Sequence, residues 1–180
     1  MSNVNHTLPV VQGPKTLEEF MAQALAMELE AAERYTQFAD ALEQHNNREV
    51  ASLFRTMAQH EGKHARRIMA EMGWREAPAL PPHAQNWPGN ESPEAAPFDE
   101  VHYLMQPWHA LQLALTAERR AEAFFAVLSR LTDNLAVRNA AIEMRAEETH
   151  HVALVQAWID KTPKPDVDWS VDPDPPRYTD

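Results

Sequence analysis

The sequence predicts an all-α protein in which four long helices form a bundle of two antiparallel helical hairpins. Three observations support this fold class. Only 4 of the 180 residues are glycine, and long stretches rich in Ala, Leu, Glu and Arg favour helix. Apolar residues recur at helical spacing in four of these stretches, whereas strand-like alternation is not evident. Proline-rich segments separate the second stretch from the third and follow the fourth, and such segments interrupt helices.

The whole chain is expected to form a single domain, because 180 residues are enough to bury one substantial core. Its four helices are expected at about residues 16–43, 47–73, 107–131 and 134–161. Thr16 with Glu19 forms a capping box that opens the first helix. Asn46 and Asn47 can cap the second helix, and Gly73 suits its C-terminal cap because glycine readily adopts a left-handed conformation.

The connection between the hairpins, residues 74–106, has a different composition from the helices. Six of its prolines fall within about twenty residues, which a continuous helix cannot tolerate. It could be a flexible linker between two domains, but we favour a crossover within one bundle, because neither hairpin could bury its apolar stripe alone. Residues 1–15 are expected to form an extended or disordered arm, and residues 162–180 an extended tail rich in Pro and Asp.

Each apolar stripe contains one glutamate at a position that should face the core. The four are Glu28, Glu61, Glu118 and Glu148. A buried carboxylate is costly unless it is paired. Glu61 and Glu148 are each followed three residues later by a histidine, His64 and His151, one helical turn along the same face. Two divalent cations would balance four carboxylates and leave both imidazoles neutral as ligands, which is the pattern of a carboxylate-bridged dinuclear site.

The two hairpins also look like copies of one unit. The matching segments are Ala24–Glu28 with Ala114–Glu118, and Met57–His64 with Met144–His151. The midpoints between the paired acids fall in the turn-like stretches 44–47 and 132–134. If each hairpin folds there, its two glutamates face each other at one level, and a pseudo-twofold axis passes through the site.

These positions lead to an assignment of ligand roles. Glu61 and Glu148 are the bridging candidates; Glu28 and Glu118 are terminal carboxylates; His64 and His151 each serve one ion. Oxygen-rich ligation with one imidazole per ion suits iron or manganese better than a closed zinc site. The expected cofactor is therefore two Fe ions per chain, with Mn or a mixed Fe/Mn pair as alternatives.

Four neighbouring residues leave alternatives open. Glu147 and His150 offer a rival register in the fourth helix. The apolar positions, however, place Glu148 and His151 on the stripe. Glu122 flanks the stripe and is expected at the rim, with an additional ligand as the less favoured alternative. Tyr35 is expected to pack in the core, with its hydroxyl bonded to a ligand carboxylate or a water in the second coordination shell.

Composition excludes several other functions. The net charge of −11 disfavours nucleic-acid and anionic-membrane partners. The absence of cysteine excludes disulfides, thiolate metal sites and cysteine nucleophiles. The sequence has no apolar run of 18 residues, and its start does not read as a signal peptide, so a cytoplasmic location is the default expectation.

The pattern resembles the ferritin-like diiron superfamily, and most closely its rubrerythrin branch. The residues that carry the resemblance are Glu28 with Tyr35, Ala58–Ala65, Glu118 and Glu148–His151. It covers roughly residues 16–161 and implies a ferritin-like four-helix bundle whose diiron site reacts with dioxygen or peroxide, often in a homodimer. Rubrerythrins typically have a rubredoxin-like iron site held by cysteines, which this chain lacks. They also have a second carboxylate in the third helix, where this chain has Ala121.

The leading functional hypothesis is an oxidoreductase of the peroxidase or ferroxidase type, which reduces peroxide or dioxygen or oxidises ferrous iron. Electrons would come from a separate donor protein, because nothing in the sequence resembles a second redox centre. Two rivals remain. One is a diiron hydroxylase of an organic, quinone-like substrate, and the other is a non-catalytic iron-binding or storage protein. A ferritin cage is less favoured because the proline-rich tail shows no short fifth helix.

Overall fold

The computed structural model describes residues 13–80, 92–97 and 100–166, and it contains four long helices. They are α1 (Leu17–Gln44), α2 (Arg48–Met72), α3 (Pro107–Leu131) and α4 (Leu135–Ile159). Every boundary lies within two residues of the position expected from the sequence. Most of the N-terminal arm and most of the tail fall outside the described residues.

Local capping explains where three of the helices begin or end. The Thr16 hydroxyl accepts a hydrogen bond from the backbone N–H of Glu19 at the start of α1. Asn134 caps α4 by accepting from the backbone N–H groups of Ala136 and Val137. At the end of α2, Gly73 has φ +67°, which a residue with a side chain adopts only with strain.

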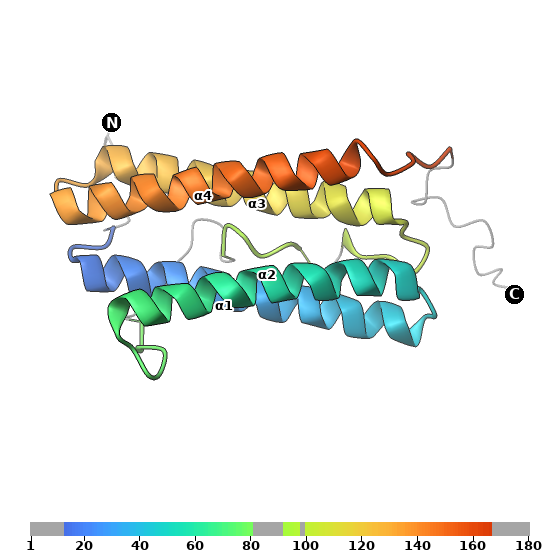
Figure 1. The fold of residues 1–180 in the computed structure, drawn as a ribbon, viewed down its shortest axis with the longest axis horizontal. Helices are drawn as coiled ribbons and strands as arrows, with labels where there is room; N and C mark the ends of the chain where they lie inside the picture. Colours follow the sequence, from blue (N-terminus) through green and yellow to red (C-terminus); the bar gives the residue numbers. More distant parts are fainter. Residues whose placement is uncertain (1–12, 81–91, 98–99, 167–180) are drawn as a thin grey trace, which may run out of the picture.

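The helices form two antiparallel hairpins, α1 with α2 and α3 with α4, which pack as two layers (Figure 1). The α1–α2 turn lies at the same end of the bundle as the start of α3 (Figure 1). At the opposite end, the side-chain amide of Asn134 donates to the carbonyl of Lys15 at 2.9 Å, which ties the α3–α4 turn to the start of α1. This arrangement confirms the predicted four-helix bundle of the ferritin-like type.

The core is divided into two apolar clusters that lie on either side of a polar level. One cluster contains the aromatic residues Tyr35, Phe38 and Phe54, and the other contains Phe20 and Phe125. In every helix the buried glutamate lies at the junction of the two clusters. The flanking pairs of buried residues are Met27 and Ala31, Met57 and Ala65, Leu115 and Ala121, and Met144 and Val155. The four acids are therefore surrounded by packed apolar side chains from above and below.

The crossover passes between the two hairpins on its way to α3 (Figure 1). Its described residues contain no α-helix, and residues 92–97 lie deep in the bundle. Near its end, the Asn47 side-chain amide donates to the carbonyl of Met105 at 2.6 Å and to that of Tyr103 at 3.3 Å. No helix in the described part of the chain is long and apolar enough to cross a membrane.

Candidate metal centre

Each of the four helices contributes one fully buried glutamate to the centre of the bundle. The exposed fractions are 1% for Glu28, 2% for Glu61, 2% for Glu118 and 0% for Glu148. Helical periodicity explains the burial, because each acid occupies the position where the next core residue would stand. The structure thus brings together all four acids singled out in the sequence.

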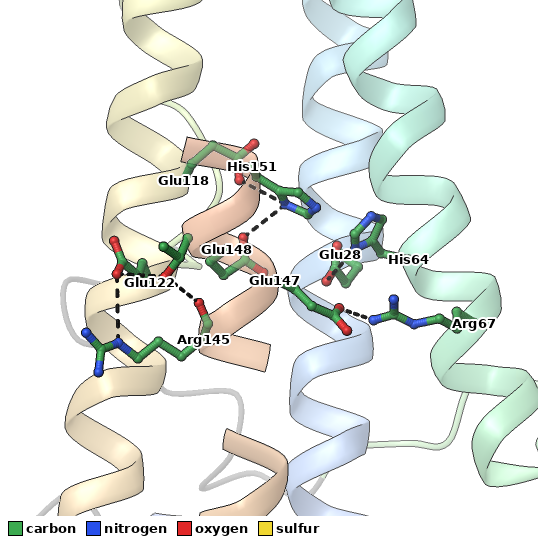
Figure 2. Close-up of polar contacts among 10 residues, drawn as sticks. Glu28, His64, Arg67, Glu118, Glu122, Arg145, Glu147, Glu148 and His151 are labelled. Carbon is green, nitrogen blue, oxygen red and sulfur yellow. Dashed lines mark hydrogen bonds and ion pairs between the residues drawn. The ribbon is translucent and has the colours of Figure 1, made fainter. Parts of the chain in front are cut away.

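One half of the centre is formed by α3 and α4. The side chains of Glu118, Glu148 and His151 each offer one ligand atom, and these atoms lie within 4.8 Å of one another. Nδ1 of His151 is 3.4 Å from Oε2 of Glu118 and 3.3 Å from Oε2 of Glu148 (Figure 2). The spacing of three residues in α4 places imidazole and carboxylate on one helical face, as expected. Two carboxylates and one imidazole form a metal-ligand set.

The other half is formed by α1, α2 and the crossover. Glu28 and Glu61 form a second group of ligand atoms within 4.8 Å, and its third member is Glu94. Nδ1 of His64 lies further out, 4.0 Å from Oε1 of Glu28. The rings of His64 and His151 are 4.4 Å apart between centroids, so the two halves of the site meet at their imidazoles.

Sequence reasoning missed Glu94. This residue is 1% exposed, between the buried residues Ser92 and Ala95. Its segment has no helical periodicity, because prolines at 93 and 97 flank it. The single signal in the sequence was a glutamate next to two alanines in an otherwise proline-rich stretch, which did not indicate burial.

The site contains polar atoms that the protein itself does not satisfy. Among the described residues, buried ligand atoms without a hydrogen-bond partner are Oε2 of Glu28, Glu61 and Glu118, both oxygens of Glu94 and Glu148, and Nδ1 of His64. Buried polar atoms are normally paired, so a convergent group of unpaired ones requires an explanation. Divalent cations would provide the missing partners. The donor set therefore fits the dinuclear metal site expected from the sequence.

The carboxylates also show the electrostatic cost of convergence. Burial, followed by repulsion from neighbouring acids, raises the pKa of Glu61 to about 8 and that of Glu28 well above its usual value. Burial raises the pKa of Glu148 to about 7, even though the His151 ring, with Nδ1 3.3 Å from Oε2 of Glu148, opposes the shift. Cations bound between these groups would lower the free energy of their ionised forms.

The two histidines differ in protonation in the absence of metal. Burial acts to lower the pKa of His151, but its close contacts with the carboxylates of Glu118 and Glu148 outweigh burial and raise that pKa to about 11. Burial and the neighbouring His151 together lower the pKa of His64 to about 4. Without metal, the protonated form is therefore favoured for His151 and the neutral form for His64.

Tyr35 packs in the core with 1% of its surface exposed, and its ring stacks on Phe54 at 5.8 Å between centroids. Burial and the nearby acids, Glu118 first, raise the pKa of its hydroxyl well above the usual value. That hydroxyl has no hydrogen-bond partner among the described residues, so the bond expected to a ligand carboxylate is not formed. Tyr35 remains a second-shell candidate by its position.

The alternative ligands have other contacts at the rim (Figure 2). Glu147 forms an ion pair with Arg67 of α2, and His150 is exposed. Glu122 accepts a hydrogen bond from the Thr149 hydroxyl at 3.0 Å and belongs to neither group of converging ligand atoms. The geometry therefore favours the register in which Glu148 and His151 face the site.

A small pocket reaches the site between α2, α3 and α4. Its volume is about 20 Å³, which is enough for roughly one water molecule. The polar lining consists of Glu61, Glu118, His151 and His60, and the apolar lining of Met57, Leu154, Val155 and Trp158. The ring of His60 meets that of Trp158 edge to face, at 6.1 Å between centroids.

Comparison with known proteins agrees with this geometry. The family model described as Rubrerythrin matches residues 19–88, which include the first hairpin and the start of the crossover. A crystal structure of an uncharacterised conserved protein from Magnetospirillum magnetotacticum MS-1 is 36% identical in sequence, with a TM-score of 0.62. The alignment covers 85% of this chain and 99% of that one.

The chain belongs to the rubrerythrin family. Among curated proteins, no relative matches it. Membership in the rubrerythrin family supports a carboxylate metal site, and the two groups of ligand atoms lie where such a site would be built. The 180 residues contain no cysteine, so none of them can form a rubredoxin-like iron site.

Proposed function

We propose that this rubrerythrin-family protein is a non-haem diiron or dimanganese oxidoreductase that reduces peroxide or dioxygen. One ion would be held by Glu118, Glu148 and His151, and the other by Glu28 and Glu61 with His64 near them. Glu61 and Glu148 remain the bridging candidates. The observation that carries the proposal is the convergence of buried, unpaired carboxylate oxygens from all four helices.

Iron or manganese suits this donor set, because carboxylates predominate and only one imidazole is available to each ion. When bound, such ions supply a redox couple and Lewis acidity toward an oxygen species. The surrounding protein keeps bulk water out, since the acids are almost completely buried between two apolar clusters. In such surroundings charge interactions are stronger than in water.

The pocket favours a small substrate. Glu61, Glu118 and His151 line it, so a molecule that enters would reach groups from both halves of the site. A volume of about 20 Å³ accommodates a molecule close to water in size, such as dioxygen or hydrogen peroxide. A small oxygen species fits this pocket better than a quinone-like substrate does, so the pocket favours the oxidoreductase over the hydroxylase alternative.

Electrons would come from a separate donor protein, because the chain has no cysteine-ligated iron site of its own. We also infer a homodimer, which is what the family resemblance implies. Analytical ultracentrifugation checks the dimer, which is independent of the metal site. A protein that sediments as a monomer would remove that part of the proposal.

The decisive experiment measures metal content and turnover together. Metal-free protein is loaded with Fe²⁺ without oxygen, desalted, and analysed for iron, with two ions per chain expected. Hydrogen peroxide is then added with a chemical reductant, and its consumption is followed while iron is measured again. Repeated turnover at a constant two ions per chain supports the oxidoreductase. A parallel sample receives excess Fe²⁺ in air, and iron that accumulates there well beyond two ions per chain, without peroxide turnover, indicates storage. A single ion per chain contradicts the dinuclear site.

A further inference from the structure

The crossover contributes a buried segment to the interior of the bundle. Residues 92–97 lie between the hairpins, with exposed fractions of 0% for Ala95 and 1% for Ala96. Arg34 of α1 donates to the carbonyl of Ala96 at 2.8 Å, and Arg120 of α3 donates to the carbonyl of Ala95 at 3.0 Å. Two arginines, one from each hairpin, thus hold consecutive carbonyls of the crossover.

This anchoring places the carboxylate of Glu94 beside those of Glu28 and Glu61. Glu94 precedes the two anchored residues, and its ligand oxygen lies within 4.8 Å of those of Glu28 and Glu61. Both oxygens of Glu94 are buried, and neither has a hydrogen-bond partner in the described part of the chain. In its ionised form, an acid so deeply buried carries a large cost unless a cation shares its site.

The sequence also lacks a ligand that a rubrerythrin of the usual pattern would have. Ala121 stands one turn after Glu118 in α3, and its side chain is fully buried but offers no donor atom. The half of the site built on α3 and α4 has its imidazole, His151, within 3.4 Å of both of its carboxylates. In the other half, His64 is 4.0 Å from the nearer carboxylate oxygen, and Glu94 completes the close group instead.

We propose that Glu94 of the crossover is a ligand of the ion held by Glu28 and Glu61, in place of the second carboxylate that α3 lacks. The inference rests on the proposed dinuclear site. It makes the two ions chemically different, because only the ion near Glu28 and Glu61 would have a carboxylate from the crossover. Binding of the ion near Glu28 and Glu61 is then coupled to docking of residues 92–97 between the hairpins.

The test uses the full chain, made metal-free with a chelator and titrated with Mn²⁺, with free Mn²⁺ followed by electron paramagnetic resonance. The variant is Glu94→Gln, which keeps the side-chain size and removes the charge. The matched control is Glu100→Gln, an exposed acid of the same crossover. We expect the parent and the control to bind two ions. Mutation of a residue that only contacts a metal ligand lowers metal affinity by about 10–100-fold. Glu94→Gln should therefore keep one ion and bind the other at least about tenfold more weakly.

The outcomes separate this inference from the proposed function. A parent that binds no Mn²⁺ overturns the dinuclear site itself. A parent that binds two ions, with Glu94→Gln binding both at the parental affinity, overturns only the role of Glu94. An equal loss of Mn²⁺ affinity in Glu94→Gln and Glu100→Gln also overturns the role of Glu94, because the effect would then come from the net charge of the chain.

Hydrogen exchange of the unmodified chain provides a second measurement that does not depend on a variant that folds. Addition of Mn²⁺ should slow backbone exchange in residues 92–97 together with the middle of the helices. Exchange at residues 92–97 that does not change, while the helix centres become protected, would contradict the coupling between the crossover and the ion.

Discussion

His151 and His150 are adjacent histidines with opposite environments. Nδ1 of His151 is 3.3 Å from a carboxylate oxygen of Glu148, whereas His150 is exposed. We expect His151→Ala to remove one of the two ions preferentially and to abolish peroxide turnover, because that ion loses its imidazole. His150→Ala is the matched control and should retain both. Metal analysis after desalting decides, and loss of an ion from His150→Ala would mean that the α4 register is wrong by one residue.

The buried acids have an electrostatic cost that bound metal ions would relieve. Replacing Glu28 and Glu118 together with Leu should end metal binding and turnover. The same change should leave the metal-free protein at least as stable as the metal-free parent, because apolar side chains of similar size avoid buried charge. Thermal melts of metal-free samples measure this. A double variant that melts well below the parent would show that these acids stabilise the fold without metal.

Phe38→Ala is the opposite case on the same stripe of α1. The Phe38 side chain is 0% exposed and packs edge to face with Tyr35 and Phe54. Its truncation leaves a cavity and should cost about 3–5 kcal/mol of the free energy of unfolding. Chemical denaturation of metal-free protein measures the loss, and a cost below about 1 kcal/mol would contradict the packed core described here.

At the scale of elements, Asn47 joins a helix to the crossover. Its side-chain oxygen, Oδ1, caps α2 by accepting from the backbone N–H of Val50. Its side-chain NH₂ group donates to the backbone carbonyls of Tyr103 and Met105. Asn47→Ala removes both functions and should cost about 1–2 kcal/mol or more. Asn47→Asp keeps the cap acceptor but loses the donor, so its cost should come only from the crossover bonds. Urea denaturation of the two variants separates the contributions, and equal stability of Asn47→Ala and the parent would contradict both.

The helices and their acids could be predicted because their signals are local and periodic. Thr16 and Gly73 mark helix ends through capping chemistry, and the position of Glu28 among apolar residues at helical spacing indicates its burial. Glu94 could not be predicted in this way. Its burial depends on Arg34 and Arg120, which are distant in sequence and hold the crossover from two different helices.

The internal repeat had a similar limit. It predicted equivalent roles for His64 and His151, which stand at matching positions of the two copies. In the structure, His151 lies against its two carboxylates, whereas His64 is further from Glu28. The crossover belongs to neither copy, and its Glu94 joins the close group on one side only. The sequence repeat within the helices therefore indicates the pseudo-twofold symmetry of the bundle. It does not indicate that the crossover breaks this symmetry at the site.

At the scale of the whole molecule, the shifted pKa values predict how metal-free stability depends on pH. The pKa of Glu61 rises from 4.5 to about 8 and that of Glu148 to about 7, mainly through burial. A carboxyl whose pKa is higher in the folded state than in the unfolded state favours folding at low pH. This contribution is lost as pH rises through the folded pKa. His151, raised to about 11, acts in the same direction.

His64 acts in the opposite direction, but only between about pH 4 and 6.5, because its folded pKa is lowered to about 4. The clearest window is therefore pH 6.5 to 8, where the metal-free protein should lose stability as pH rises. Urea denaturation at several pH values in the presence of a chelator measures the trend. Stability that stays constant or increases across this window would show that the acids do not converge in the metal-free protein.

The proposed ligands come from both hairpins, and these are joined through one long crossover. Bound ions would therefore crosslink two halves of a chain that has no cysteine with which to form a disulfide. A crosslink that closes a long loop restricts the unfolded chain strongly. Unlike a disulfide, this one can be opened by a chelator and closed again without an oxidant. The lifetime of the folded state, and not only the redox chemistry, should then depend on how much metal the surroundings supply.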